Sequence, residues 1–339
     1  MLNYIKNITL LLCLTLLTIS LQSCKLNDEN EEVPIIPEPE PGMWFVGQIS
    51  TGGNAVYVKG KIVNGTQYAF VANGSAGLSV VNISNAASPT IASSYQTNGF
   101  TKEVFIDTVN NVNYLFASDT VKGLYILNCS NPVSFVLDTL IQYPGVNSVN
   151  RKNNYLYVAM NGGTLKVLNI STLPDSVNEV FSYNTANIVN HIEISNNTAY
   201  LVENISGIEF VNINDPANPV QYSVFHSPGN CYNIKVADHL VYVADGNVGI
   251  SIINAANPVQ PYFVNSTNTE TNVKNIDYSP NFLFTAEGNS GVEVLNVFNV
   301  VEPEFTGYYT PDNYCYSVNY FKAKVLVANG NGGLLILRF

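Results

Sequence analysis

The stretch VLVANGNGGLLILRF, from Val325 to Phe339, decides the fold. Two apolar runs flank a turn of Gly and Asn, the residue types that tolerate the positive φ of tight reversals. The stretch therefore predicts two antiparallel strands joined by a short turn, with no further strand after them. Because two strands alone do not make a stable sheet in water, we expect the partners of this pair elsewhere in the chain.

The second apolar run belongs to a series of similar runs, each of which follows a Gly-rich turn. The runs begin at Leu78, Leu124, Leu165, Ile208, Ile250, Val292 and Leu334. Sequence periods of about 42 residues with strand-type alternation are typical of β-propeller blades. The unit that starts at Cys231 contains four strand patterns, CYNIKVAD, LVYVAD, GISIIN and QPYFVN. The repeat predicts an all-β fold, a seven-bladed β-propeller of four-stranded antiparallel blades over residues 43–339.

The last unit of the repeat lacks its fourth strand. That strand is present at the other end of the domain, where MWFVGQIS (Met43 to Ser50) aligns with QPYFVN and directly precedes the first unit. We expect this N-terminal strand to pair with LLILRF and to close the ring, with Trp44 and Phe45 buried. Such closure removes the exposed sheet edge at which other chains could pair.

The N-terminal residues predict an export signal. Lys6 precedes a mostly apolar run from Ile8 to Ile19, which is too short for a membrane span and typical of a signal peptide. The run leads to LQSC, which resembles the bacterial lipoprotein signal. We therefore expect a signal peptide at 1–23 and lipidation of Cys24. The alternative is an ordinary secretory signal with a chance cysteine.

Residues 24–42 are acidic and rich in proline, and such segments bury too little apolar surface to fold. They predict a disordered tether. Acidic residues directly behind the lipidated Cys resemble the surface-export signal of Bacteroidetes-type lipoproteins. This resemblance implies an outer membrane lipoprotein that faces outward, and the alternative is a merely solvated linker on a periplasm-facing protein.

The formal net charge of −11 disfavours nucleic acid and anionic membrane surfaces as partners. We expect contact with the membrane only through the lipid anchor, and a monomeric domain.

The repeat units resemble the LVIVD repeat of bacterial and archaeal cell-surface proteins, in which a G-L-x-V-x-D-I-S-N-P stretch recurs in a β-propeller. This chain departs from that pattern at the Asp. The aligned residues are Asn82, Asn128, Asn169, Asn212, Asn254, Asn296 and Arg338. Asn can cap the following turn as Asp does, so the fold expectation stands. The resemblance implies a surface scaffold and no particular enzyme class.

The His and Cys residues predict no catalytic or zinc centre. His191 falls in an innermost strand, His226 in a loop between units and His239 in a turn on the opposite face, so the three should not meet. Cys129, Cys231 and Cys315 occupy positions that other units fill with Ile or Val. We expect them to be small buried apolar residues.

Two sets of polar residues are candidates for a site at the mouth of the central channel. The first set begins each innermost strand and comprises Ala55, Glu103, Ser148, His191, Asn233, Asn275 and Ser317. The second set ends each next strand and comprises Asn73, Ser118, Met160, Glu203, Asp245, Glu287 and Asn329. We single out His191, Asn233, Asn275, Glu203, Asp245 and Glu287 as candidate ligand-binding residues.

Three successive units place a carboxylate at one equivalent position, at Glu203, Asp245 and Glu287. Carboxylates that converge on a funnel suit Ca²⁺ or a polar ligand. The alternative is that they cap turns beside a water-filled channel. No other cofactor is expected.

The sequence favours a binding or adhesion scaffold for a protein or glycan rather than an enzyme. The alternatives are a propeller enzyme, lactonase- or lyase-like, or a cation-dependent binder that uses the channel mouth.

Overall fold

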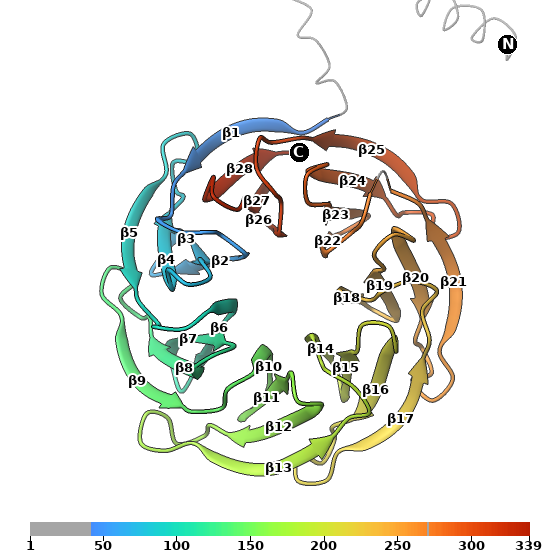
Figure 1. The fold of residues 1–339 in the computed structure, drawn as a ribbon, viewed down its shortest axis with the longest axis horizontal. Coiled ribbons are helices and arrows are strands. Elements are labelled where there is room, and N and C mark those ends of the chain that lie inside the picture. Colours follow the sequence, from blue (N-terminus) through green and yellow to red (C-terminus); the bar gives the residue numbers. More distant parts are fainter. Residues whose placement is uncertain (1–41, 270) are drawn as a thin grey trace, which may run out of the picture. The chain divides into compact units, whose positions relative to one another are not determined.

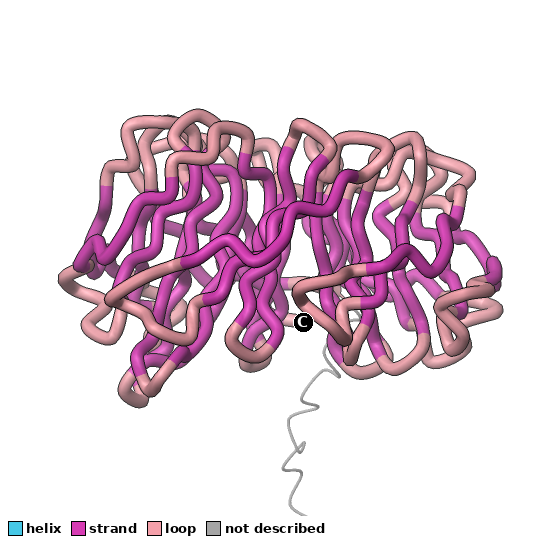
Figure 2. Tube along the Cα trace, turned by 90° about the horizontal axis from the view of Figure 1, so that it is seen from below, coloured by secondary structure: helices cyan, strands magenta, loops and turns pink. Residues whose placement is uncertain are grey.

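The computed structural model describes residues 42–269 and 271–339, and every regular element in these ranges is a β-strand. Seven four-stranded antiparallel sheets surround a central axis as the blades of a propeller (Figure 1). Seen from the side, the strands run between two faces that carry the loops (Figure 2). The fold predicted from the repeat is confirmed. None of the described residues forms a helix long and apolar enough to cross a bilayer.

Each blade uses its strands in sequence order from the axis outward, except the seventh. The innermost strands are β2 (Tyr57–Val63), β6 (Thr101–Val109), β10 (Val146–Lys152), β14 (His191–Ser195), β18 (Asn233–Ala237), β22 (Asn275–Ser279) and β26 (Ser317–Phe321). The second strands are β3 (Thr66–Ala72), β7 (Val112–Asp119), β11 (Tyr155–Met160), β15 (Thr198–Val202), β19 (Leu240–Ala244), β23 (Phe282–Ala286) and β27 (Lys324–Ala328). We number the blades from one to seven in the order of these strands.

The third strands are β4 (Leu78–Asn82), β8 (Gly123–Asn128), β12 (Thr164–Asn169), β16 (Ile208–Asn212), β20 (Ile250–Asn254), β24 (Val292–Asn296) and β28 (Leu334–Arg338). The outer strands are β5 (Thr90–Tyr95), β9 (Val136–Ile141), β13 (Asn178–Asn184), β17 (Val220–Phe225), β21 (Tyr262–Thr267), β25 (Glu304–Tyr309) and, for the seventh blade, β1 (Trp44–Ile49). Every outer strand shows a register shift against the third strand of its blade.

The hydrophobic core lies between the blades. Seven clusters of buried side chains fill the seven contacts between neighbouring blades, and the second and third strands supply most of their members. These strands are almost wholly apolar because both of their faces are covered. The three described cysteines are free and buried, as expected of small core residues.

The N-terminal strand closes the ring as predicted. β1 pairs with β28 from Trp44↔Arg338 to Ile49↔Leu334, and the two lie side by side at the rim (Figure 1). The expected burial of Trp44 and Phe45 is wrong, since their exposed fractions are 40% and 54%. Met43 is the buried side chain here, at 6% exposed. An outer strand has no further strand beyond it, so its aromatic residues can face solvent.

The asparagines at the LVIVD aspartate position cap the turns that follow the third strands. The Oδ1 of each Asn accepts a hydrogen bond from the backbone N–H two residues later, at 2.9–3.0 Å. The acceptors are Asn82, Asn128, Asn169, Asn212, Asn254 and Asn296. The capping that Asn was expected to share with Asp is confirmed.

Candidate functional site

The innermost strands bring a ring of polar side chains together around the channel. Equivalent backbone bridges at Ala55, Thr101, Cys231, Val273 and Cys315 fix the alignment of the blades. The first inward-facing residue comes two positions later in each blade. These residues are Tyr57, Glu103, Ser148, His191, Asn233, Asn275 and Ser317. Alignment of the repeats predicted six of these seven residues correctly. In the first blade the prediction was wrong by two residues, since it gave the buried Ala55 in place of Tyr57.

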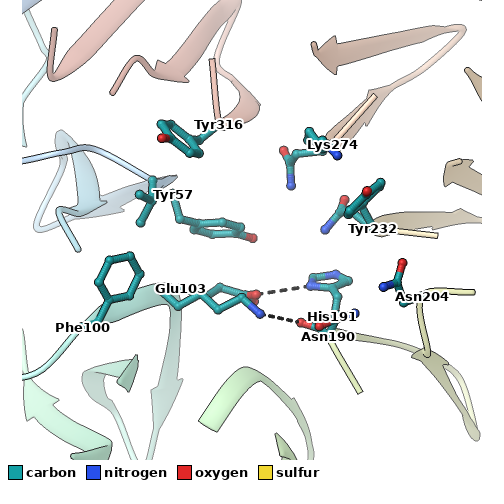
Figure 3. Close-up of a pocket in the computed structure, with 13 residues that line it drawn as sticks. Tyr57, Phe100, Glu103, Asn190, His191, Asn204, Tyr232, Lys274 and Tyr316 are labelled. Carbon is teal, nitrogen blue, oxygen red and sulfur yellow. Dashed lines mark hydrogen bonds and ion pairs between the residues drawn. The ribbon is translucent and has the colours of Figure 1, made fainter. Parts of the chain in front are cut away.

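A cavity of about 430 Å³ opens at the end of the channel where the innermost strands begin. Its walls combine aromatic rings, side-chain amides and two lysines, with Glu103 and His191 between them (Figure 3). The lining residues are Val56, Tyr57, Phe100, Lys102, Glu103, Asn190, His191, Asn204, Tyr232, Asn233, Lys274, Asn275 and Tyr316. We refer to it as the mouth cavity. The predicted site residues His191, Asn233 and Asn275 meet in it.

His191 links three blades at the floor of the mouth cavity. Its Nδ1 lies 3.2 Å from Ser148 Oγ and 3.3 Å from Glu103 Oε2. Ser148 Oγ also donates to Glu103 Oε1 at 2.9 Å. Ser148 and Glu103 therefore both contact the same ring nitrogen. In a nucleophilic triad the base uses opposite nitrogens for the nucleophile and for its orienting carboxylate, so this cluster does not have triad geometry.

A second inward layer lies two residues further along the innermost strands and carries most of the channel's charges. Lys235 Nζ lies 3.5 Å from Glu193 Oε2 and 3.8 Å from Asp277 Oδ1. Asp277 Oδ2 accepts hydrogen bonds from Asn319 Nδ2 at 2.7 Å and from the Tyr320 backbone N–H at 2.8 Å. Lys59, Glu193 and Lys235 line a deeper cavity of about 180 Å³. Asp277 lies beside it, next to Lys235.

The charges of the second layer offset one another. Burial acts to lower the pKa of Lys235, but the charges of Glu193 and Asp277 raise it overall. Burial lowers the pKa of Lys59, and the nearby charge of Lys235 adds to this effect. Sequence reasoning missed this layer because it considered only one position per strand. Side chains two residues apart on a strand point to the same side. An inward-facing His191 therefore predicts an inward-facing Glu193, and Asn233 likewise predicts Lys235.

The three carboxylates predicted to converge do not meet. Asp245 accepts from the Gly229 N–H at 3.3 Å and from Ser251 Oγ at 2.7 Å, both in its own blade. Glu287 likewise accepts from the Thr271 N–H at 3.3 Å. Glu203 accepts from Asn187 Nδ2 at 3.4 Å. All three side chains are at least nine-tenths buried, and none lines the mouth cavity or the deeper cavity.

These carboxylates hold the loop that enters their own blade. A second strand is flanked by the strands on either side of it, so its side chains face neighbouring blades and loops rather than the axis. Residues 42–269 and 271–339 contain no group of three or more His, Cys, Asp or Glu residues that could hold a metal ion. Glu203, Asp245 and Glu287 do not form such a group, and calcium binding by them stays a prediction.

Burial raises the pKa of two of these carboxyl groups toward or above neutral pH. Burial raises the pKa of Glu203 to about 8, and its hydrogen bond with Glu209 adds to the shift. Burial also raises the pKa of Glu287 to about 7. A carboxyl group that stays protonated can donate a hydrogen bond inside the fold, which suits a structural role better than the binding of a cation.

The raised pKa of Glu203 predicts a pH-dependent stability. Above the usual value of 4.5 the unfolded chain loses this proton while the folded protein keeps it, so the free energy of unfolding falls as pH rises. The fall ends near pH 8. We expect Glu203→Gln to melt at least about 2 °C higher than the natural protein at pH 8, and the gain to shrink at pH 5. Calorimetry at both pH values measures this, with Glu304→Gln, an exposed carboxylate, as the control. An equal effect of Glu203→Gln at both pH values would contradict the assignment.

Neither of the remaining histidines lines the mouth cavity. His226 lies between β17 and β18, and His239 lies in the turn between β18 and β19. The predicted lipidation site Cys24, the predicted signal peptide and all of the predicted tether except Gly42 fall outside the described residues.

Comparison with known proteins identifies the repeat. The family model described as LVIVD repeat matches residues 53–97, 111–140, 146–185 and 228–269, which fall in the first, second, third and fifth blades. No curated protein matches this chain. Among solved structures, the chain is similar to the crystal structure of the computationally designed Ika8 protein. The identity is 8% and the TM-score is 0.60, with 88% of this chain and 100% of that chain covered. At this identity the likeness shows the fold alone.

Proposed function

We propose that this LVIVD-repeat propeller is a lipid-anchored protein of the bacterial cell surface that binds a glycan in the mouth cavity. The observation that carries the proposal is the composition of the cavity wall. Tyr232, Tyr316 and Phe100 offer flat apolar surfaces, while four asparagines offer amide donors and acceptors. Sugar rings present apolar faces and hydroxyl edges, which these groups complement. The volume of about 430 Å³ lies within the range of small-ligand sites.

The anchor rests on the sequence. The apolar run, LQSC and the acidic segment behind Cys24 support lipidation and export to the outer surface. The propeller would then stand on a tether of residues 24–42, as a monomer that touches the membrane only through its lipid.

One experiment on intact cells tests both parts. Cells that display the full chain should bind fluorescent oligosaccharides from a panel, and antibody should label the domain without permeabilisation. Tyr232→Ala should keep the antibody signal and lose about tenfold or more in glycan affinity, since one aromatic contact with its burial is worth about 1.4 kcal/mol. Cys24→Ser should lose the cell signal, while the released protein still binds glycan.

The matched control is Tyr262→Ala. Tyr262 is an exposed aromatic residue of the outer strand β21, with 58% of its surface exposed. Glycan binding that is insensitive to Tyr232→Ala, or lost equally in Tyr262→Ala, would contradict the cavity as the site. Binding of a protein and of no glycan would replace the ligand class.

A second candidate function is an enzyme in which His191 acts as a base. Its Nε2 has no hydrogen-bond partner and lies 3.9 Å from Glu193 Oε2. Chemical turnover of a bound glycan that is abolished by His191→Gln, with binding retained, would favour this candidate over a binding scaffold.

A further inference from the structure

We propose that the mouth cavity selects an acidic saccharide, and that Lys102 and Lys274 receive its carboxylate. The inference rests on the proposed glycan-binding function and names the class of glycan. The two lysines occupy the same position in the second and sixth blades, directly before the first inward residue of the strand. The equivalent residues of the other five blades are uncharged. They are Val56, Asn147, Asn190, Tyr232 and Tyr316.

Both lysines line the cavity, and neither forms an ion pair with a described residue. Lys102 Nζ donates to the Asn190 carbonyl oxygen at 3.4 Å. Lys274 Nζ lies 3.6 Å from the centre of the Tyr232 ring. Both side chains are half-buried. Two partly desolvated cations are thus held at the rim of one cavity by neutral partners.

This pair contrasts with the other two lysines of the channel. Lys59 and Lys235 lie among Glu103, Glu193 and Asp277 in the deeper layer, where their charges are offset. The whole chain has a formal net charge of −11, so unpaired cations in a cavity need a reason. Burial lowers the pKa of Lys102, and the nearby charge of Glu103 only partly offsets this effect. A bound carboxylate would offset the remaining cost.

Glu103 is the one carboxylate among the residues that line the mouth cavity. Its Oε1 accepts from Ser148 and its Oε2 faces His191 Nδ1, so both oxygens are engaged. Two other polar atoms of lining residues are buried and have no hydrogen-bond partner, His191 Nε2 and Asn204 Oδ1. Buried polar atoms are rarely left unpaired in native proteins. Ligand hydroxyl groups would satisfy them.

The occupant that fits is therefore a sugar with a carboxylate. The aromatic rings receive the ring face, the amides and His191 bind hydroxyls, and the lysines bind the acid. An acidic peptide shares only the last of these features, and its binding is an outcome of the test.

The test compares ligands that differ only in charge. The probes are methyl glucuronoside, methyl galacturonoside and N-acetylneuraminate, each as the free acid and as its methyl ester, titrated calorimetrically into the full propeller domain. We expect at least one acid to bind about tenfold or more tightly than its ester. The preference should shrink as salt is raised.

Lys102→Met, Lys274→Met and the double variant should lose this preference, so that the acid and its ester bind with similar affinity. Met keeps the length of the stem without the charge, and removal of an unpaired half-buried charge should not unfold the domain. Lys122→Met is the control, because Lys122 is exposed in the turn between β7 and β8 and should keep the preference.

Each outcome has a distinct meaning. Equal binding of acid and ester would overturn the role of the lysines and leave the proposed glycan-binding function intact. Tighter binding of an acidic tetrapeptide than of every saccharide would overturn the saccharide class. Binding of no saccharide at all, here or in the wider panel, would overturn both proposals.

Discussion

Deletion of residues 43–50 is expected to abolish cooperative folding of the propeller. The deletion removes the whole ladder between β1 and β28 and the burial of Met43. A buried methionine alone is worth about 2–5 kcal/mol, and each lost ladder hydrogen bond adds about 0.5–1.5 kcal/mol. The sum reaches the total stability of many domains, about 5–15 kcal/mol. Circular dichroism during heating and size-exclusion chromatography should show unfolding, or aggregation through the bared edge of β28.

The double variant Trp44→Ala/Phe45→Ala separates the ladder from the side chains. Both aromatics are exposed by 40% or more, so we expect this variant to melt close to the natural protein. A deletion with an unchanged melting curve would refute ring closure by β1. A double variant as unstable as the deletion would show that the aromatic side chains, and not the ladder, hold the ring together.

Asp277→Ala is expected to cost about 2–6 kcal/mol of stability, because each buried hydrogen-bond donor left without an acceptor costs about 1–3 kcal/mol. The change removes one of the two carboxylates beside Lys235. It also leaves Asn319 Nδ2 and the Tyr320 N–H without their acceptor. Denaturant unfolding measures the loss.

Asp277→Asn is the matched variant, because the amide oxygen still accepts those two hydrogen bonds while the charge is gone. It should lie between the natural protein and Asp277→Ala. Equal stability of Asp277→Ala and the natural protein would mean that Glu193 alone is sufficient for Lys235, and that the channel network adds nothing to the fold.

The blades could be predicted from the sequence because their signal is local and repeated. Runs such as Leu334 to Arg338 follow a Gly-rich turn in every unit, and both faces of these strands are covered by neighbouring blades. The closing strand was found by alignment of Met43 to Ser50 with the other outer strands. The same alignment could not show which side chains of that strand are covered, and the expected burial of Trp44 and Phe45 was wrong.

The site was predicted only in part. Alignment of the repeats shows where along its strand a residue lies, between the two faces of the propeller, but not the direction in which its side chain points. His191, Asn233 and Asn275 begin innermost strands, where an inward residue has only the channel to face. Glu203 and its equivalents directly follow second strands, and their side chains contact the loops of their own blades. Lys102 and Lys274 are a further case. Nothing in their local sequence marks them, and they line one cavity only because the ring brings the second and sixth blades to one opening.

The pairing of Trp44 with Arg338 also determines when the ring can form. Six blades are made of consecutive strands and can assemble as soon as their own residues are available. The seventh needs a contact between the first and the last strand of the domain, and the entropy of closing so long a loop must be offset before that contact adds stability. Completion of the ring is therefore a late folding event. A chain that emerges strand by strand from a ribosome would therefore stay an open arc of blades until its final strand is available.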